Sequence, residues 1–315
     1  MRKLAAVLLI MLFFTMPLAA NAAGNIKDTA GKFTYSNDTT TLPYRLILPE
    51  NYDESKEYSL LFFFHGAGER GNDNEKQFFH CVQYLADNMP ETIIVAPQCP
   101  EGQQWVDTPW ANGAYSIEEV PESDEMKAVM ELLDELKEKY SVDTDRIYAS
   151  GISMGGFGTW DAIMRHNDVF AAAIAVCGGG DPSQAENLVD VPLFVFHGDK
   201  DDAVPVSGSR DTVQAIKDAG GTKVEYVEYA GAGHGIWNNA FATEGLLEKL
   251  LNQRLSDRIP VEESSEEPSE DVSDTSASSG SGNGGFLNYA HFVPIIAAVA
   301  ISIGLVIYTI IKYKK

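Results

Sequence analysis

The stretch Arg146–Gly156, RIYASGISMGG, decides the fold of this chain. It is an apolar run that ends in the pattern G-x-S-x-G, with Ser153 at the centre. Between a strand and a helix, this pattern holds the serine in a strained turn, and the small flanking residues let the two elements approach closely. We therefore predict that Ser153 is a nucleophile at the end of a strand. A plain structural turn is the alternative, since glycine and serine are common in turns.

Apolar runs recur on both sides of this motif. Strands that are apolar at nearly every position are buried on both faces, which is typical of a parallel sheet covered by helices. The run at 224–229 alternates apolar and polar residues, so we expect it near an edge of the sheet. The other predicted strands are residues 42–48, 58–64, 92–96, 171–176 and 192–196.

Helical patterns lie between these strands, and the longest has apolar residues at three- and four-residue steps. The alternation of strand and helix predicts one doubly wound α/β domain over residues 25–256, which is long enough for a substantial core. The connection after the 171–176 strand is too short for a large cap domain. The predicted helices are residues 124–140, 156–167, 207–219 and 244–254.

A nucleophilic serine needs a base, and the base needs a carboxylate, in the chain order Ser, Asp, His for this type of domain. Three carboxylates follow the 192–196 strand, at Asp199, Asp201 and Asp202. Each of them faces the ligand crevice if the strand is parallel, so the pattern alone leaves all three open. His234 follows the last predicted strand in a glycine-rich loop, from which it can reach back to the serine.

The other histidines stand in different contexts. We expect packing or structural roles for His65 and His197, which directly follow strands, and surface or packing roles for the rest: His80, His166 and His291.

Backbone amides should stabilise the oxyanion of the reaction, one after the nucleophile and one from an early loop. The first is the N–H of Met154. The second comes from the H-G-x-G pattern of the loop at 65–71, where we assign the N–H of Ala67.

Taken together, these motifs resemble those of secreted bacterial α/β-hydrolases described as predicted peptidases or carboxylesterases, near the dienelactone-hydrolase, feruloyl-esterase and prolyl-oligopeptidase groups. The resemblance covers about residues 40–250. It rests on YRLILP at 44–49, HGAGERG at 65–71, APQCP at 96–100, GISMGG at 151–156 and HGDKDDAVP at 197–205.

The resemblance implies an α/β-hydrolase fold and ester hydrolysis through an acyl-enzyme, without a metal or a cofactor. It places the acid of the catalytic triad at Asp201, within the pattern H-G-x-x-D-x-x-V-P. The chain departs from prolyl oligopeptidases in lacking an added β-sandwich or propeller sequence, which weakens a peptidase assignment.

Aromatic and charged residues near these loops are candidates for contact with the substrate. Each tryptophan could instead be a packing residue, and Glu69 and Arg70 could instead pair with each other. The candidates are Trp105, Trp110, Trp237, Glu69 and Arg70.

The termini predict a location outside the cell. Residues 1–22 have a basic start, an apolar run and an A-x-A site, which indicates a signal peptide; a retained anchor is the alternative. Residues 292–311 carry no charge and precede the basic tail 312–315, which predicts a transmembrane helix with a cytoplasmic C-terminus. A GPI-type processing signal is the rival interpretation.

The segment 257–290 is rich in acidic residues, serine and glycine. It cannot bury enough apolar surface to fold, so we expect a disordered stalk, with an acidic interaction tail as the alternative. The net charge of −23 gives no basic face for nucleic acid. The three cysteines are expected to be buried and unpaired, although a bridge between Cys81 and Cys99 stays open.

Three functions follow from these expectations. The first is a surface-tethered serine esterase that acts on small or carbohydrate-linked esters, such as acetyl or feruloyl esters. The second is a serine peptidase for short peptides, and the third is a catalytically inactive surface-binding protein.

Overall fold

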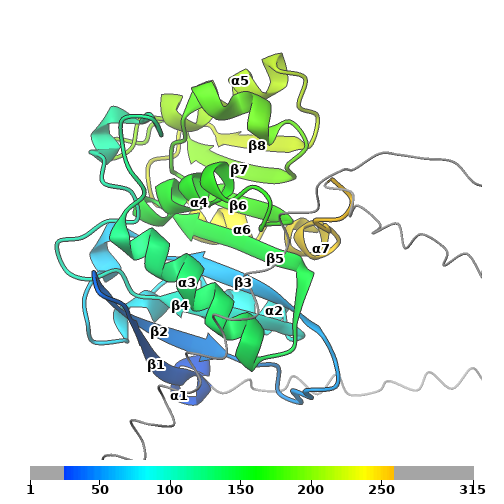
Figure 1. Ribbon diagram of the computed structural model, residues 1–315. Helices are drawn as coiled ribbons and strands as arrows, with labels where there is room; N and C mark the ends of the chain where they lie inside the picture. The colour runs from blue at the N-terminus through cyan, green and yellow to red at the C-terminus, as the bar shows by residue number, and fades with distance from the viewer. Residues whose placement is uncertain (1–24, 259–315) are drawn as a thin grey trace, which may run out of the picture. The chain divides into compact units, whose positions relative to one another are not determined.

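A computed structural model of the chain describes residues 25–258. Its centre is an eight-stranded sheet in the order β1-β2-β4-β3-β5-β6-β7-β8 (Figure 1). The strands are β1 Gly31–Ser36, β2 Thr41–Ile47, β3 Tyr58–Phe64, β4 Thr92–Pro97, β5 Val142–Ile152, β6 Ala172–Val176, β7 Leu193–Gly198 and β8 Val224–Tyr229.

The sheet is mostly parallel, as the sequence predicts. From β4 to β8 every neighbouring pair is parallel, whereas β1 with β2 and β2 with β4 are antiparallel. The alternating strand β8 lies at one edge, which confirms its predicted place. β1 at the other edge was not predicted, because its half-exposed sequence GKFTYS lacks the apolar run that marks the buried strands.

Helices cover both faces of the sheet (Figure 1). The helix at 244–254 is shorter than predicted, because Gly245 takes a left-handed conformation before its first turn. The short helices α1, α2 and α6 have too few turns to show a periodic apolar stripe. The helices are α1 Ile26–Thr29, α2 Val82–Asn88, α3 Asp124–Lys139, α4 Met154–Arg165, α5 Ser207–Asp218, α6 Trp237–Phe241 and α7 Leu246–Leu251.

The two faces carry separate hydrophobic cores. Along β3, Leu60, Phe62 and Phe64 point into the core shared with α3, α4 and α5. Leu61 and Phe63 point into the core shared with α2, α6 and α7. Because side chains alternate across a strand, a continuous apolar run fills both cores at once, and each such side chain contributes about 1.5–3 kcal/mol on burial.

The carboxyl ends of the parallel strands meet at one edge of the sheet, where ligands bind in open α/β folds. The loops that follow β3, β5, β7 and β8 open there, and they carry Ala67, Ser153, Asp201 and His234. The connection between β6 and β7 holds only a short 3₁₀ helix, Pro182–Leu188, which agrees with the absence of a large cap in this part of the chain.

The described residues 25–258 lie within one compact unit of the chain. Within the described residues 25–258, no helix is both long and apolar enough to span a membrane. The predicted signal peptide, transmembrane helix and basic tail lie outside that range, as does nearly all of the stalk at 257–290.

Candidate active site

Ser153 lies in the turn between β5 and α4. Its backbone has φ 55 and ψ −120, and such a conformation costs a non-glycine residue about 1–3 kcal/mol. A Cβ on Gly151 would lie 2.2 Å from the carbonyl oxygen of Gly155, and one on Gly155 would lie 1.9 Å from that of Phe64. Only hydrogen fits at these two positions, so strand and helix approach as closely as the motif predicts.

The structure brings Ser153, His234 and Asp201 together. The Oγ atom of Ser153 lies 2.7 Å from Nε2 of His234, and Nδ1 of His234 lies 2.7 Å from Oδ2 of Asp201. The carboxylate accepts and cannot donate, so it fixes the histidine proton on Nδ1. Nε2 is then free to accept the hydroxyl proton of Ser153, which is the arrangement a general base needs.

Asp201 is the buried member of this group. Its side chain has no exposed surface, and its Oδ1 accepts the N–H groups of Ala203 at 3.0 Å and Val204 at 2.9 Å. Burial alone would raise the pKa of the carboxyl, but hydrogen bonds from His197, His234 and Val204 hold it far below its usual range. The group is therefore ionised whenever the protein is folded near neutral pH.

The alternatives to Asp201 lie elsewhere in the loop. Asp199 accepts the N–H of Gly231 at 2.6 Å and so ties this loop to the one that carries His234. Asp202 is exposed.

A second histidine touches the same carboxylate. Nε2 of His197 lies 3.2 Å from Oδ2 of Asp201, and its Nδ1 lies 2.8 Å from Oγ of Ser209. His197 is fully buried, as a structural role requires. The contact of His197 with Asp201 was not predicted, although His197 lies at the end of β7 and Asp201 follows only four positions later, in the loop after that strand.

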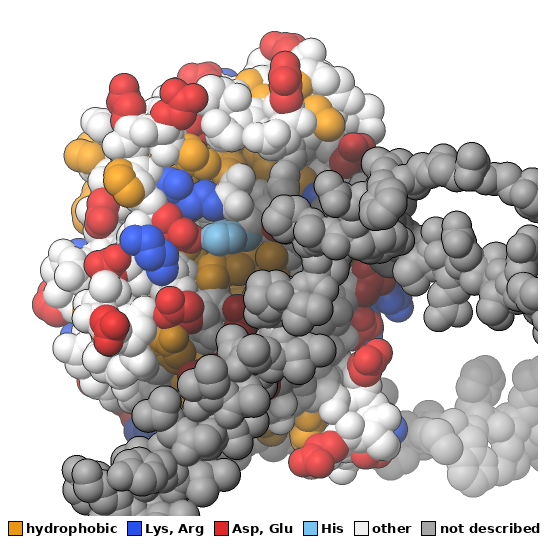
Figure 2. All heavy atoms as spheres, viewed as in Figure 1, with side chains coloured by type: hydrophobic (Ala, Val, Ile, Leu, Met, Phe, Trp, Pro, Cys, Tyr) orange, Lys and Arg blue, Asp and Glu red, His pale blue; other side chains and the backbone are white. Residues whose placement is uncertain are grey.

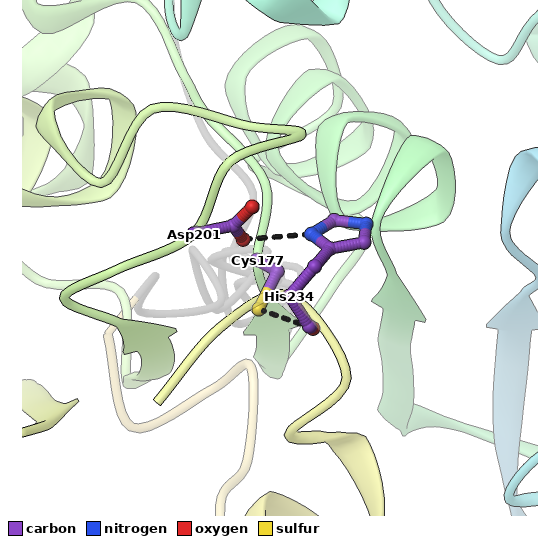
Figure 3. A group of neighbouring side chains, drawn as sticks. All are labelled: Cys177, Asp201 and His234. Atoms are coloured by element: carbon purple, nitrogen blue, oxygen red, sulfur yellow. Dashed lines mark hydrogen bonds and ion pairs between the residues drawn. The ribbon is translucent and has the colours of Figure 1, made fainter. Parts of the chain in front are cut away.

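Cys177 lies directly beside these residues, at the end of β6. Figure 3 shows its sulfur pointing to the backbone carbonyl of His234, at 3.3 Å. Burial and the charge of Asp201 raise the pKa of the thiol, so it stays protonated and braces the loop as a donor. All three cysteines are buried and free, so the expectation of unpaired thiols is confirmed and Cys81 does not bridge to Cys99.

Two backbone amides in the loops that carry the site have no hydrogen-bond acceptor within residues 25–258. Met154 is the first residue of α4 and Ala67 the first residue of a 3₁₀ helix, Ala67–Glu69, so neither N–H has an acceptor in its own helix. Neither donates to any other group within residues 25–258. They are the two donors that the sequence assigns to the oxyanion.

His65 fixes the peptide that carries the Ala67 amide. Its Nε2 accepts the N–H of Cys99 at 2.9 Å, so its proton must be on Nδ1, which donates to the carbonyl of Gly66 at 2.7 Å. Burial lowers the pKa of His65 to about 4, which keeps the ring neutral. The expected structural role is therefore one of orienting the loop beside Ser153.

Trp105 is not a surface for substrate. The side chain is fully buried, and its indole N–H donates to the carbonyl of His65 at 3.1 Å. A Cβ on Gly158 would lie 2.7 Å from Cβ of Trp105, so the tryptophan packs against α4. The predicted contact of Trp105 with substrate is therefore wrong, and the alternative prediction of a packing residue is correct. The reason is that the loop after β4 folds back into the core.

Glu69 and Arg70 do not pair with each other. Glu69 is 3% exposed and accepts the N–H of Gly66 at 2.8 Å, so its predicted contact with substrate is wrong. The Nε of Arg70 donates to the carbonyl of Ala67 at 2.9 Å. Its guanidinium lies 6.0 Å from the ring of Trp110, at the partly exposed end of the loop.

Two tryptophans remain partly exposed near the site. The ring of Trp237 contacts that of His234 edge-on, with centroids 5.1 Å apart, and that of His80 at 5.8 Å. Trp110 packs on a small cluster that includes Val204, whose N–H holds Asp201. Figure 2 shows histidine atoms at the surface of the described part of the chain, beside hydrophobic side chains and near charged side chains of both signs.

His166 lies away from this group, where its ring pairs with Glu122 at 2.6 Å, as expected for a surface residue. His291 is outside the described residues.

The amino-acid sequence is similar to those of known esterases. The family model described as "Putative esterase" matches residues 39–275. Over 77 residues the chain is 38% identical to the bifunctional acetylxylan esterase/xylanase of Neocallimastix patriciarum, a match of 24% of this chain and 11% of that protein. It is 26% identical over 171 residues to the Aspergillus terreus protein named "Probable feruloyl esterase C", covering 52% of this chain and 57% of the relative.

Peptidases also occur among the relatives. Dipeptidyl-peptidase 5 of Porphyromonas gingivalis is 30% identical over 139 residues, which are 42% of this chain and 19% of that protein. The chain thus spans less than two thirds of the length of each curated relative named here.

A solved structure agrees with the fold. The crystal structure of a thermostable esterase superposes with a TM-score of 0.64 at 35% sequence identity, covering 73% of this chain and 64% of that one. The family match covers more than half of the chain and includes the loops that carry Ser153, Asp201 and His234. The chain belongs to this esterase family and is a serine hydrolase of the α/β-hydrolase type.

Proposed function

We propose that the protein hydrolyses carboxylic esters through an acyl-enzyme on Ser153, with acetyl esters of carbohydrates as its first substrate class. The observation that carries this is the unbroken chain of hydrogen bonds from Ser153 through His234 to the buried Asp201, at 2.7 Å for each step. A hydroxyl, a base and an ionised orienting group at these distances suit attack on a carbonyl carbon.

The reaction has two halves. Nε2 of His234 takes the proton as Oγ of Ser153 attacks the ester carbonyl, and the resulting oxyanion accepts the N–H groups of Ala67 and Met154. The tetrahedral intermediate then expels the alcohol, which receives the proton from His234. Water repeats the sequence on the acyl-enzyme, releases the acid and restores Ser153.

Asp201 stabilises the charged imidazole during both halves. The ionised carboxylate lies against Nδ1 of His234, and the buried surroundings keep water from screening the interaction. His197 and the two loop amides hold the carboxylate in place, so it does not have to reorganise when the charge on His234 develops.

The choice of acetyl esters rests on the acetylxylan esterase relative and on the partly exposed aromatic rings near the site. Trp237 and Trp110 offer flat apolar surfaces of the kind that stack on sugar rings, and Arg70 adds hydrogen-bond donors beside Trp110. Feruloyl esters are the second proposed substrate class, which the feruloyl esterase relative supports.

The test is a substrate panel for the purified protein and its Ser153→Ala variant. Acetylated xylo-oligosaccharides, feruloylated oligosaccharides, 4-nitrophenyl acetate and short peptide amides would be compared by kcat/KM. The proposal expects acetate release that Ser153→Ala abolishes. Peptide cleavage faster than ester cleavage would replace it with a peptidase, which the dipeptidyl-peptidase relative favours. A wild-type protein without activity on any substrate would favour a binding role.

We further propose that the esterase domain lies outside the cell and is tethered to the membrane by a C-terminal transmembrane anchor. The composition of residues 1–22, 257–290 and 292–311 supports this location. Proteolysis of intact cells should release an active soluble domain. Activity that stays inside protease-treated cells would contradict the proposed location.

A further inference from the structure

Glu69 is a buried carboxyl group next to the active site for which the proposed reaction has no direct use. It lies in the same loop and the same 3₁₀ helix as Ala67, yet its side chain is buried and accepts the N–H of Gly66. A Cβ placed on Gly66 would lie 3.6 Å from Oε2 of Glu69 and 3.6 Å from Cβ of Ser153. Gly66 thus lies between the carboxyl group and the nucleophile.

Glu69 holds Gly66 from both sides. Its Oε2 accepts the N–H of Gly66 at 2.8 Å, and its own N–H donates to the carbonyl of Gly66 at 3.1 Å. The first bond is one half of a helix capping box, in which the carboxylate at the third helical position accepts the N–H of the cap residue. The second is the backbone bond of a 3₁₀ turn, since glycine has no side chain. The backbone on both sides of Gly66 is therefore fixed by one residue.

The held carbonyl determines where the Ala67 amide points. No peptide bond in the described part of the chain is cis, and in a planar trans peptide the C=O and N–H point in opposite directions. The Gly66 carbonyl accepts from Glu69 and from His65, which turns it away from the crevice. The N–H of Ala67 is then left without an internal partner, facing the other way.

We propose that Glu69 is a positioning residue for the oxyanion hole: its carboxylate locks Gly66 so that the Ala67 N–H faces the developing oxyanion. This proposal rests on the esterase reaction proposed above. Arg70 adds to the lock from the other side, since its Nε holds the carbonyl of Ala67 at 2.9 Å.

The environment of the carboxyl group makes the lock sensitive to pH. Oε1 has no hydrogen-bond partner within residues 25–258, and burial raises the pKa of Glu69 to about 7 in spite of the Gly66 amide. The titratable group beside it is the Cys81 thiol, and the backbone N–H of His80 also lowers the pKa of the carboxyl. An ionised carboxylate accepts the Gly66 N–H more strongly than a neutral one, so the hole should be best formed above pH 7.

The experiment compares two esters that differ in the atom the hole binds. One is 4-nitrophenyl acetate, and the other is its thionoacetate, in which sulfur replaces the carbonyl oxygen and accepts hydrogen bonds poorly. The ratio of their kcat values reports the oxyanion hole. Both reactions use His234 as the base, so the ratio isolates the hydrogen bonds to the oxyanion.

Glu69→Ala should lower kcat for the oxygen ester by about 10–10³-fold, where the upper limit is the loss expected when one oxyanion-hole donor is removed. The oxygen-to-sulfur ratio of the kcat values should fall as well. Glu69→Gln keeps an acceptor for Gly66 and should stay within about fivefold of wild type, since a neutral bond has roughly half the strength. Glu125→Ala is the matched control: Glu125 is equally buried and accepts from Thr40, and its loss should leave the ratio unchanged.

Equal losses on both esters in Glu69→Ala would overturn the proposal, because they indicate general damage to the fold. If Glu69→Ala does not fold, the pH dependence decides: the wild-type ratio should rise through about pH 7 and that of Glu69→Gln should stay flat. The same rise in both proteins would overturn the proposal. A wild type that hydrolyses neither ester would instead refute the esterase reaction, and the role of Glu69 with it.

Discussion

Replacing Asp201 by asparagine tests whether the carboxylate fixes the proton of His234 on Nδ1, because the two side chains have the same shape. Oδ1 of Asp201 accepts two backbone N–H groups, at 3.0 and 2.9 Å, so the asparagine must place its carbonyl oxygen there. Its NH₂ group then takes the position of Oδ2, 2.7 Å from Nδ1 of His234. Two donors would face each other unless the imidazole moves its proton to Nε2.

That change of tautomer removes the base. With its proton on Nε2, His234 cannot accept the hydroxyl proton of Ser153, although all the atoms stay in place. Loss of the correct tautomer costs about 10⁴ in kcat in a comparable triad, which corresponds to about 5 kcal/mol of transition-state stabilisation. We expect Asp201→Asn to lose kcat by about this factor and KM to change little.

The assay is kcat and KM with 4-nitrophenyl acetate, together with the melting temperature to show that the variant folds. Asp199→Asn is the control, since Asp199 lies two residues away and also accepts a loop amide, that of Gly231 at 2.6 Å. We expect it to lose less than about tenfold, because it touches no residue of the triad. A tenfold or smaller loss in Asp201→Asn, or a greater loss in Asp199→Asn, would refute this reasoning.

Three further predictions follow from the same contacts. His234→Ala should lower kcat by several powers of ten, as loss of a triad member does, and retention of most activity would point to another base. In the folded protein the pKa of Glu69 is about 7, against an ordinary value of 4.5. The preference of the folded state for the protonated carboxyl therefore contributes about 3 kcal/mol to stability below pH 4.5, and this contribution is lost as the pH rises through 7. Glu69→Gln should therefore raise the melting temperature at pH 8 relative to wild type and raise it less at pH 4; a difference independent of pH would contradict the burial of this charge. Gly155→Ala should prevent folding or cost more than about 4 kcal/mol in chemical denaturation, because its Cβ would lie 1.9 Å from the carbonyl oxygen of Phe64; a stable, active variant would contradict that packing.

The elements that could be predicted from the sequence are those with a signal at each position. The buried strands are apolar on both faces, and β3 was predicted from its first residue, Tyr58, to its last, Phe64. Ser153 and His234 could be placed because the end of a parallel strand and a loop after the last strand have fixed positions in this topology. Asp201 needed the resemblance, since three carboxylates fit the pattern equally well.

The direction of individual side chains in loops could not be predicted. Glu69 and Trp105 both lie in loops on the ligand side, yet both turn inward to hold backbone groups of Gly66 and His65. The Trp105 contact joins the loops after β3 and β4, and it exists only once both strands are paired, whereas Glu69 and Gly66 lie in the same loop. A linear sequence carries no periodicity for such contacts, whereas the contact of His197 with Asp201 had a local signal in its spacing.

The most direct test of the central claim is to identify the residue that a fluorophosphonate probe modifies. Intact-mass analysis followed by peptide mapping would locate the adduct in the wild type and in Ser153→Ala. The hydrogen-bonded chain of Ser153, His234 and Asp201 predicts one adduct per chain, on the peptide that contains Ser153, and none in the variant. An unlabelled wild type, or equal labelling of Ser153→Ala, would contradict the assignment of this serine as the nucleophile.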